Sequence, residues 1–428
     1  MKVLLLSLID GIIVAMKIAL LGYGKEGKSV ETYFKKHFAD LECDIFENFT
    51  YDEIKQKDYS SYDIFFRSPS VPPLHLENES SVTKYFFDHC PCPIIGVTAT
   101  KGKGTTCSFV KALLDADNQD AYLVGNIGTP ALDILDDLTP DSIVVYELSS
   151  FQLWDLEKSP HIAIIGHLEP DHLNIHKDYA DYLSAKSNIA NYQSADDYCI
   201  YYHNNPESKK LADKSKAHKI SYPFAIPEEI KQAINLPGEH NQDNAIAAIA
   251  AVASYKNISP DEYLRDDKTT IIEGLSSFHG LPHRLEFLCE FNGVRYYDDN
   301  FSTNPGSTRV AIDAFPNDDL VLILGGRDKT NYEDLPEIYD VLKPKNLKKI
   351  ILIGESGREL AKHYHDPRFR SANTLSAAIT AAKLEAEALA TTTNHPIVLM
   401  SPAAASFDMF ENVYDRGDQF KKLISDLS

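Results

Sequence analysis

A glycine-rich turn between an apolar segment and a helix-like segment constrains this chain more than any other feature. The turn runs from Gly96 to Thr106 (GVTATKGKGTT) and follows the apolar residues 93–95. Backbone N–H groups in such a turn point at phosphate oxygens, the dipole of the following helix favours an anion, and Lys103 would reach the terminal phosphates of ATP. An ordinary glycine turn is the alternative. Because glycines, a cation and hydroxyls occur together, the pattern favours a phosphate site in an α/β protein.

The turn departs from the regular P-loop in two ways. Five residues separate Gly96 from Gly102 where four are usual, and Gly104 stands where Ser or Thr is usual. A metal-binding hydroxyl would therefore come from Thr105 or Thr106. The ATP-binding residues predicted in the turn are Gly102, Lys103, Gly104, Thr105 and Thr106.

Length, charge and cysteine content limit the class of protein. With 428 residues, the chain is long enough for about two or three domains with buried cores. A formal charge of −21 argues against a nucleic-acid partner, which needs a concentrated cationic surface, so local cations or a metal must meet any anionic substrate. The six cysteines show neither zinc spacing nor a dense disulfide framework, and Cys90-Pro91-Cys92 is too cramped for a metal knuckle. We therefore expect reduced thiols and a cytoplasmic protein.

Residues 1–15 are expected to be an extension upstream of the functional start. Lys2 and the apolar run that ends at Ile9 resemble a short signal sequence, but Asp10 and Gly11 interrupt it and no clean small-residue cleavage site follows. A self-sufficient strand pattern begins at Met16. We expect no membrane insertion and a monomeric protein.

The first unit, 16–92, carries a second glycine-rich turn. Gly22-Tyr23-Gly24-Lys25-Glu26-Gly27 follows a strand pattern, and Glu47 lies twenty residues beyond Gly27. This spacing is typical of a dinucleotide-binding fingerprint, so an NAD-dependent dehydrogenase is an alternative hypothesis. The unit looks short for a full dinucleotide fold and directly precedes the phosphate turn, which weakens that alternative.

Two apolar strand patterns in the second unit end beside polar residues. The pattern at 143–146 ends at Glu147, and the pattern at 162–166 leads to His172. Ligands of open α/β sheets gather at the carboxyl ends of strands, so both side chains are predicted to face the phosphates, where a carboxylate would hold Mg²⁺. Taken alone, His172 would be a structural histidine and Lys186 an exposed helix lysine.

Seven segments of the chain resemble the Mur ligase family, and most closely its D-glutamate-adding branch. They follow the family's order and extend nearly end to end, so together they are highly specific although each is short. The segments are GNIG (125–128), ELSSFQL (147–153), DHL (171–173), Lys186, HNQDN (240–244), LPHR (281–284) and SPAAASFD (401–408).

The resemblance implies an α/β protein of three domains. An N-terminal Rossmann-like domain (1–92) would hold the UDP substrate, a central P-loop-type ATPase with a mostly parallel sheet (93–280) would bind ATP, and a C-terminal Rossmann-like domain (281–428) would bring the amino acid. The implied reaction is ATP-dependent addition of D-glutamate to UDP-N-acetylmuramoyl-L-alanine through an acyl phosphate, in peptidoglycan precursor synthesis.

The resemblance also implies a role for individual residues. Lys103, Glu147, His172 and Lys186 would be catalytic, with Thr105 and Glu147 on one Mg²⁺ and His172 and a carbamylated Lys186 on a second. The implied ATP contacts beyond the turn are Asn241 and Asn244 at the adenine and Arg284 and Asp299 at phosphate and ribose. The implied substrate contacts are Gly24, Glu47, Asn126, Ser149 and Gln152 for the muramoyl nucleotide and Thr303, Lys329 and Ser406 for glutamate.

Several alternatives remain open. Phe301 replaces a lysine often found in the family, and Val413 sits where an aromatic residue is common, so L-glutamate or another amino acid could replace D-glutamate. Gly104 after Lys103 resembles the folate-polyglutamating branch, although the segment 147–153 disfavours it. A catalytically silent nucleotide-binding scaffold is a further alternative of another class, as is the dehydrogenase.

Overall fold

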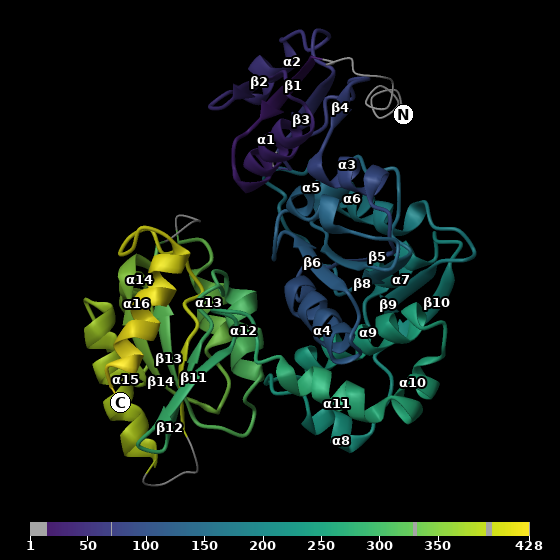
Figure 1. Ribbon diagram of the computed structural model, residues 1–428. Coiled ribbons are helices and arrows are strands. Elements are labelled where there is room, and N and C mark those ends of the chain that lie inside the picture. The colour runs from purple at the N-terminus through teal and green to yellow at the C-terminus, as the bar shows by residue number, and fades with distance from the viewer. Residues whose placement is uncertain (1–14, 70, 328–331, 391–395, 428) are drawn as a thin grey trace. The chain divides into compact units, whose positions relative to one another are not determined.

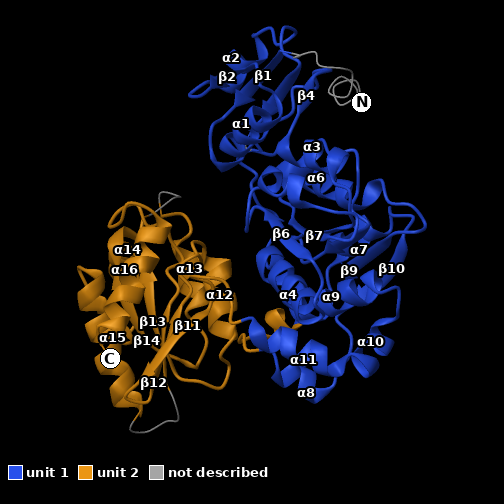
Figure 2. Ribbon diagram, in the orientation of Figure 1, with its two compact units in different colours: residues 1–234, 243–278 blue, residues 235–242, 279–428 orange. Residues whose placement is uncertain are grey.

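The computed structural model describes residues 15–69, 71–327, 332–390 and 396–427. The chain divides into two compact units, one of residues 1–234 and 243–278 and one of residues 235–242 and 279–428 (Figure 2). Three sheets are present in the described ranges, two in the first unit and one in the second (Figure 1). Within those ranges, no helix combines the length and apolar character that crossing a membrane requires.

The N-terminal sheet of the first unit has four parallel strands in the order β2-β1-β3-β4. Its central strand β1 is buried along most of its length, which explains its almost continuous apolar sequence. The strands are β1 (Met16–Leu21), β2 (Leu41–Phe46), β3 (Ile64–Arg67) and β4 (Glu79–Ser80), and the helices are α1 (Lys25–His37), α2 (Tyr51–Lys55) and α3 (Val82–His89).

The central sheet has six parallel strands in the order β10-β9-β8-β5-β7-β6. The chain leaves β5 toward one edge and later returns to the other side of β5, so the topological switch point lies at the carboxyl end of β5, where ligands of such sheets bind. The strands are β5 (Ile94–Thr98), β6 (Ala121–Gly125), β7 (Ile143–Glu147), β8 (Ile162–Ile165), β9 (Tyr198–Tyr202) and β10 (His218–Tyr222).

Helices and short 3₁₀ turns connect these strands or follow β10. They are α4 (Lys103–Ala116), η1 (Ala131–Asp133), η2 (Leu135–Asp137), α5 (Ser150–Leu153), α6 (Tyr179–Asn191), α7 (Pro206–Ala212), α8 (Glu228–Gln232), α9 (Glu239–Tyr255), α10 (Pro260–Asp266) and α11 (Lys268–Ser277). One hydrophobic cluster includes residues of both sheets of the first unit, and the Phe86 ring of α3 meets the Tyr146 ring of β7 edge-on at 5.6 Å. The two sheets therefore share a core.

The second unit is built on a six-stranded sheet in the order β11-β12-β16-β13-β14-β15, in which only the β11–β12 pair is antiparallel among the described strands. The strands are β11 (Glu286–Phe291), β12 (Val294–Asp298), β13 (Leu320–Gly325), β14 (Leu347–Ile353), β15 (Phe369–Ser371) and β16 (Ile397–Met400). The helices are α12 (Pro305–Asp313), α13 (Leu335–Val341), α14 (Gly354–His363), α15 (Leu375–Ala390) and α16 (Val413–Ser425).

The α/β class with mostly parallel sheets, predicted from the sequence, is confirmed. The strand patterns at 143–146 and 162–166 correspond to β7 and β8. Residues 1–14 of the expected extension and Lys329 lie outside the described residues.

Candidate active site

The phosphate turn has the predicted order of strand, glycine turn and helix. β5 ends at Thr98, and Gly102 is the N-cap of the 14-residue helix α4 with a left-handed backbone (φ 84°). The Lys103 Nζ lies back over the turn and donates hydrogen bonds to the carbonyls of Ala99 (3.0 Å) and Thr100 (3.1 Å). The local structure that the sequence predicts is thus confirmed, whereas ATP binding by these residues stays a prediction.

A side chain at Gly102 would displace Asn244. A Cβ at this position would lie 2.8 Å from the Asn244 Oδ1 on α9, and the positive φ is itself unfavourable for other residues. The Thr106 hydroxyl donates both to the Gly102 carbonyl (3.0 Å) and to the same Asn244 oxygen (3.2 Å). Asn244 therefore borders the phosphate turn, although 138 residues separate it from Thr106.

Glu147 ends β7 and is only 3% exposed. Its Oε1 accepts a hydrogen bond from the Asn126 Nδ2 at 3.3 Å, while its Oε2 is buried with no hydrogen-bond partner among the described residues. A buried carboxylate oxygen without a partner is unfavourable, and such oxygens are the ligands that Mg²⁺ prefers. The site at Glu147 therefore fits a divalent cation.

Lys186 lies on α6 and is buried, contrary to the default expectation of an exposed helix lysine. Its Nζ donates to the Thr98 hydroxyl (3.0 Å) and to the Ala99 carbonyl (2.9 Å), which also accepts from Lys103. Burial, and to a lesser degree the charge of Lys103, lower the pKa of Lys186 well below its usual value. The amine therefore loses its positive charge far more readily than an exposed lysine does.

His172 has a left-handed backbone (φ 53°) and a half-exposed side chain whose ring centroid lies 5.0 Å from that of Phe151. Partial burial lowers the pKa of His172, the adjacent Asp171 raises it, and the charges of Lys103 and Lys186 lower it further. The charges of both lysines therefore act on the His172 imidazole.

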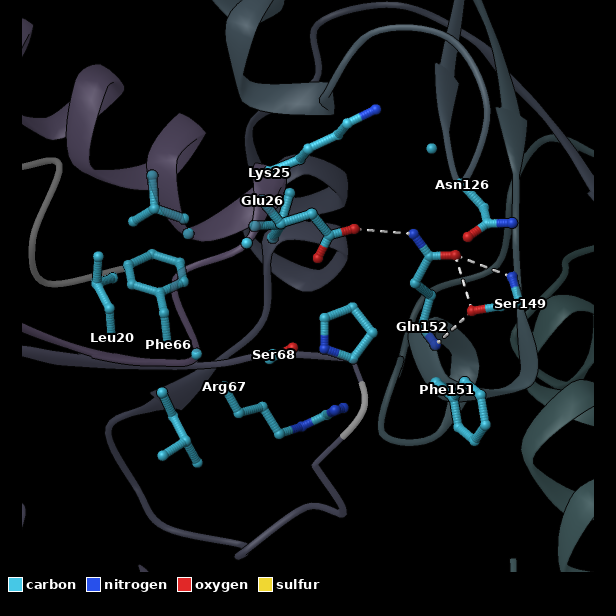
Figure 3. A pocket seen from close by; sticks show the side chains of 18 of the residues that line it. Leu20, Lys25, Glu26, Phe66, Arg67, Ser68, Asn126, Ser149, Phe151 and Gln152 are labelled. Carbon is cyan, nitrogen blue, oxygen red and sulfur yellow. Dashed lines mark hydrogen bonds between the residues drawn. The ribbon is translucent and has the colours of Figure 1, made fainter. Parts of the chain in front are cut away.

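A pocket of about 480 Å³ is lined by the glycine turn after β1 and by Lys103 at the start of α4. Figure 3 shows the part of its lining around Glu26 and Gln152. Its lining comes from both sheets of the first unit. The lining residues are Leu20, Leu21, Gly22, Gly24, Lys25, Glu26, Gly27, Val30, Phe66, Arg67, Ser68, Pro69, Val82, Lys103, Gly125, Asn126, Ser149, Phe151, Gln152 and His172.

Gln152 is the centre of the polar network in this pocket (Figure 3). Its Oε1 accepts from the hydroxyl and the backbone N–H of Ser149 (both 2.9 Å), and the Ser149 hydroxyl accepts from the Gln152 backbone N–H in turn. This reciprocal capping box starts α5. The Gln152 Nε2 donates to the Glu26 Oε1 at 3.1 Å, and burial raises the pKa of Glu26 to about 7, although Gln152 and Arg67 act in the opposite direction.

The pocket gathers some of the predicted residues and leaves out others. Gly24, Lys103, Asn126, Ser149, Gln152 and His172 line it, whereas Glu47 is exposed just after β2 and is not among the lining residues. Sequence reasoning missed Lys25, Glu26, Arg67, Ser68 and Phe151. The signal for Glu26 was its place in the glycine turn, and that for Arg67 its place at the carboxyl end of a buried strand.

The second unit holds the remaining described candidates. The Arg284 guanidinium lies 5.3 Å from the centroid of the Phe301 ring, which also meets the Tyr414 ring edge-on at 5.2 Å. Asp299 is buried and accepts from the Ser401 hydroxyl at 2.8 Å, and burial raises the pKa of Asp299 to about 7. Phe301 thus packs its ring against the guanidinium of Arg284.

The other candidates in this unit are Asn241, Ser406 and Thr303. The Asn241 Nδ2 donates to the Pro237 carbonyl at 2.7 Å. The Ser406 hydroxyl is buried with no hydrogen-bond partner in the part of the chain that the structure describes, and its contact with glutamate stays a prediction. Thr303 is half-buried just after β12.

Two family models match the chain over more than half of its length. The "Mur ligase middle domain" matches residues 97–232, and the "Mur ligase, glutamate ligase domain" matches residues 283–403. The first span contains all but the first residue of the phosphate turn, together with Glu147, His172 and Lys186.

Curated relatives cover most of the chain. A protein of Clostridium kluyveri named UDP-N-acetylmuramoylalanine–D-glutamate ligase is 33% identical over 86% of this chain and 84% of its own length. A protein of the same name from Acetivibrio thermocellus is 30% identical over 96% of both chains. Among solved structures, UDP-N-acetylmuramate-alanine ligase MurC of Thermotoga maritima shares the fold, with a TM-score of 0.59 and 17% identity over 96% of this chain and 100% of that one.

Proposed function

This chain belongs to the Mur ligase family, and from that premise we propose that it adds D-glutamate to UDP-N-acetylmuramoyl-L-alanine with ATP, in peptidoglycan precursor synthesis. The observation that carries the proposal is the pocket of about 480 Å³ with a glycine turn at one end and Lys103 at the other. We infer that the UDP group lies at the glycine turn and the muramoyl carboxylate near Lys103. The dehydrogenase hypothesis accounts only for the glycine turn at 22–27 and Glu47, and the relatives favour the ligase.

The reaction must activate a carboxylate, which is a poor electrophile. The substrate carboxylate would attack the γ-phosphorus of ATP, the bond to the bridging oxygen would break, and ADP would leave. The neutral amine of glutamate would then attack the acyl carbon, lose a proton, and displace phosphate. Lys103 would exchange its contacts to the carbonyls of Ala99 and Thr100 for phosphate oxygens and stabilise their charge.

The proposed metal ligands are Thr105 and Glu147 for one Mg²⁺ and His172 and Lys186 for another. Bound Mg²⁺ neutralises charge on the transferring phosphoryl group. The partnerless Oε2 of Glu147 supports the first position. Lys186 would serve as a carbamate formed with CO₂, which converts an amine that would repel Mg²⁺ into an anionic ligand, and its buried position beside the phosphate turn supports this role.

We propose that three segments of the chain bind the three substrates. Residues 1–92 would hold the UDP group, 93–280 the ATP, and 281–428 the amino acid. The proposed contacts are Asn241 and Asn244 for adenine, Arg284 and Asp299 for phosphate and ribose, Gly24, Glu47, Asn126, Ser149 and Gln152 for the muramoyl nucleotide, and Thr303, Lys329 and Ser406 for the glutamate carboxylates.

Phosphate release tests the proposed reaction directly. Purified protein is given ATP, Mg²⁺ and UDP-N-acetylmuramoyl-L-alanine, with D-glutamate, L-glutamate or no amino acid. We expect release that depends on D-glutamate. Release that depends on L-glutamate would retain the chemistry and overturn the specificity, and no release with either would overturn the proposed function.

Chemical rescue tests the carbamate. Lys186→Ala is expected to abolish turnover, and a short carboxylic acid is expected to restore part of it by supplying the missing anionic ligand. Lys209→Ala, which removes a half-exposed lysine of α7, is the matched control and should retain full turnover. Normal turnover in Lys186→Ala would rule out the carbamate.

A further inference from the structure

Cys90 and Cys92 form a close pair of thiols on the segment that joins the two sheets of the first unit. Cys90 is the C-cap of α3, and β5 begins two residues after Cys92. The two Sγ atoms lie 3.6 Å apart, and the Cys90 Sγ also lies 3.5 Å from the Cys92 carbonyl oxygen. Neither thiol has a part in the proposed ligase reaction.

The two thiols are chemically unequal. The hydrogen bond with Cys92 lowers the pKa of Cys90, although burial acts in the opposite direction, and the same hydrogen bond together with burial raises the pKa of Cys92. The thiolate is the reactive form of cysteine. Cys90 is therefore suited to attack first, and Cys92 to follow once Cys90 no longer carries charge.

Access and reactivity also distinguish this pair from the other cysteines. Cys90 and Cys92 are half-buried and flank the exposed Pro91, whereas Cys107 and Cys199 are fully buried. Burial also raises the pKa values of the half-buried Cys43, to about 11, and Cys289. A small reagent can therefore reach the pair, and it meets a more reactive thiol there than elsewhere.

We propose that Cys90 and Cys92 are a redox-active dithiol that low-molecular-weight disulfides, such as oxidised glutathione, convert reversibly into an intramolecular disulfide. The Cys90 thiolate attacks one sulfur of the reagent, whose S–S bond breaks, and the first thiolate leaves and takes up a proton. Cys92 then loses its proton and attacks the Cys90 sulfur, and the second thiolate leaves. Two protein thiols are oxidised, and one disulfide is reduced to two thiols.

The geometry allows the bond to form and favours its reduction. An S–S bond is about 2.05 Å long, so the sulfurs must approach by roughly 1.5 Å, which side-chain rotation can supply. The ring that such a bond closes contains only Pro91 between the two cysteines, and constrained, accessible disulfides are the more easily reduced ones. The product is therefore expected to be reversible.

Thiol counting on the full chain tests the proposal independently of ligase activity. Reduced protein is equilibrated with oxidised glutathione, quenched, denatured and titrated, and the peptides are mapped by mass. We expect two of the six thiols to disappear, the peptide that spans 90–92 to lose the mass of two hydrogens, and dithiothreitol to restore both thiols. A count that stays at six, or losses at other cysteines, would overturn the proposal.

Serine variants define the order of the steps. Cys92→Ser is expected to stop at a mixed disulfide on Cys90, and Cys90→Ser to react at least about tenfold more slowly because the better nucleophile is gone. Cys289→Ser is the matched control and should still lose two thiols. A mixed glutathione adduct that persists on Cys90 in the unaltered protein would contradict an intramolecular disulfide.

Discussion

Replacing Arg67 with methionine is expected to destabilise the first unit by about 3 kcal/mol, because it removes the cation from a buried ion pair. The Arg67 side chain is fully buried at the end of β3. Its Nη2 contacts Asp155, its Nε lies 3.3 Å from the Glu79 Oε1, and its Nη1 donates to the Val71 carbonyl at 3.1 Å. Methionine retains much of the apolar stem, so the loss is mainly electrostatic.

The size of the expected stability loss depends on the hydrogen bonds and the solvent contact that Glu79 and Asp155 retain when the cation is removed. Breaking a buried pair by removing one partner costs about 3–5 kcal/mol, since the other charge is left buried. Glu79 is 4% exposed, but it still accepts from the backbone N–H groups of Leu74 (3.0 Å) and Leu76 (3.1 Å), and Asp155 is 15% exposed and reaches some water. Both features place the expected loss at the lower end of the range.

Tryptophan fluorescence during urea unfolding is a suitable assay. Trp154 is the single tryptophan of the chain and lies in the first unit next to Asp155, so its signal reports on that unit. Arg265→Met is the matched control in the same unit. The guanidinium of Arg265 pairs with Asp266 at 2.8 Å, but the two side chains are 68% and 52% exposed, so water screens the pair and we expect a much smaller loss than in Arg67→Met.

A second variant checks the cause of the loss. Adding Asp155→Asn to Arg67→Met removes one of the uncompensated charges and should recover part of the lost stability. A loss in Arg67→Met no larger than in Arg265→Met, or no recovery in the double variant, would refute this account of the buried pair.

Three further predictions concern the same unit. The folded state raises the pKa of Glu26 from 4.5 to about 7 and so favours the neutral acid, and the free energy of unfolding should therefore fall as the pH rises from 4.5 to 7. Glu26→Gln should reduce this pH dependence, measured by urea denaturation at several pH values. An unchanged pH dependence in the variant would show that Glu26 does not cause it. Gly102→Ala should lower the free energy of unfolding by about 1–2 kcal/mol, because the backbone at this position is left-handed. The added methyl group should also displace Asn244 and raise the KM for ATP. Gly24→Ala is the control: its position is open and its φ is negative, so the KM for ATP should not change. Glu147→Gln should be at least as stable as the unaltered protein without Mg²⁺ and lose the rise in Tm that added Mg²⁺ produces; an equal rise in both proteins would argue against Glu147 as a ligand.

Local sequence patterns predicted the elements that carry the site. The apolar run before Gly96 and the turn GKGTT predict a strand, a turn and a helix, and β5, Gly102 and α4 follow that order. The apolar run at 143–146 likewise puts Glu147 at the carboxyl end of a buried strand. These features depend on neighbouring residues, so they can be read from a short window of sequence.

Long-range contacts could not be predicted in this way. Lys186 on a helix would ordinarily be exposed, and its burial depends on how α6 packs against Thr98, 88 residues away. The hydrogen bond between Glu26 and Gln152 joins residues 126 positions apart. Glu26 lies on the helix that follows β1 of the N-terminal sheet, and Gln152 on the helix that follows β7 of the central sheet. Only the three-dimensional arrangement of the sheets brings such pairs together, because no local pattern encodes their distance.

The capping box of Ser149 and Gln152 limits how substrate preference can evolve at this pocket. The same Gln152 oxygen that accepts from Ser149 also fixes where α5 starts, and the amide nitrogen is committed to Glu26. A substitution at Gln152 that suited a different ligand would also shift the start of the helix. Substitutions that change substrate preference are therefore expected at lining positions without a capping role, such as Lys25 at the exposed start of α1.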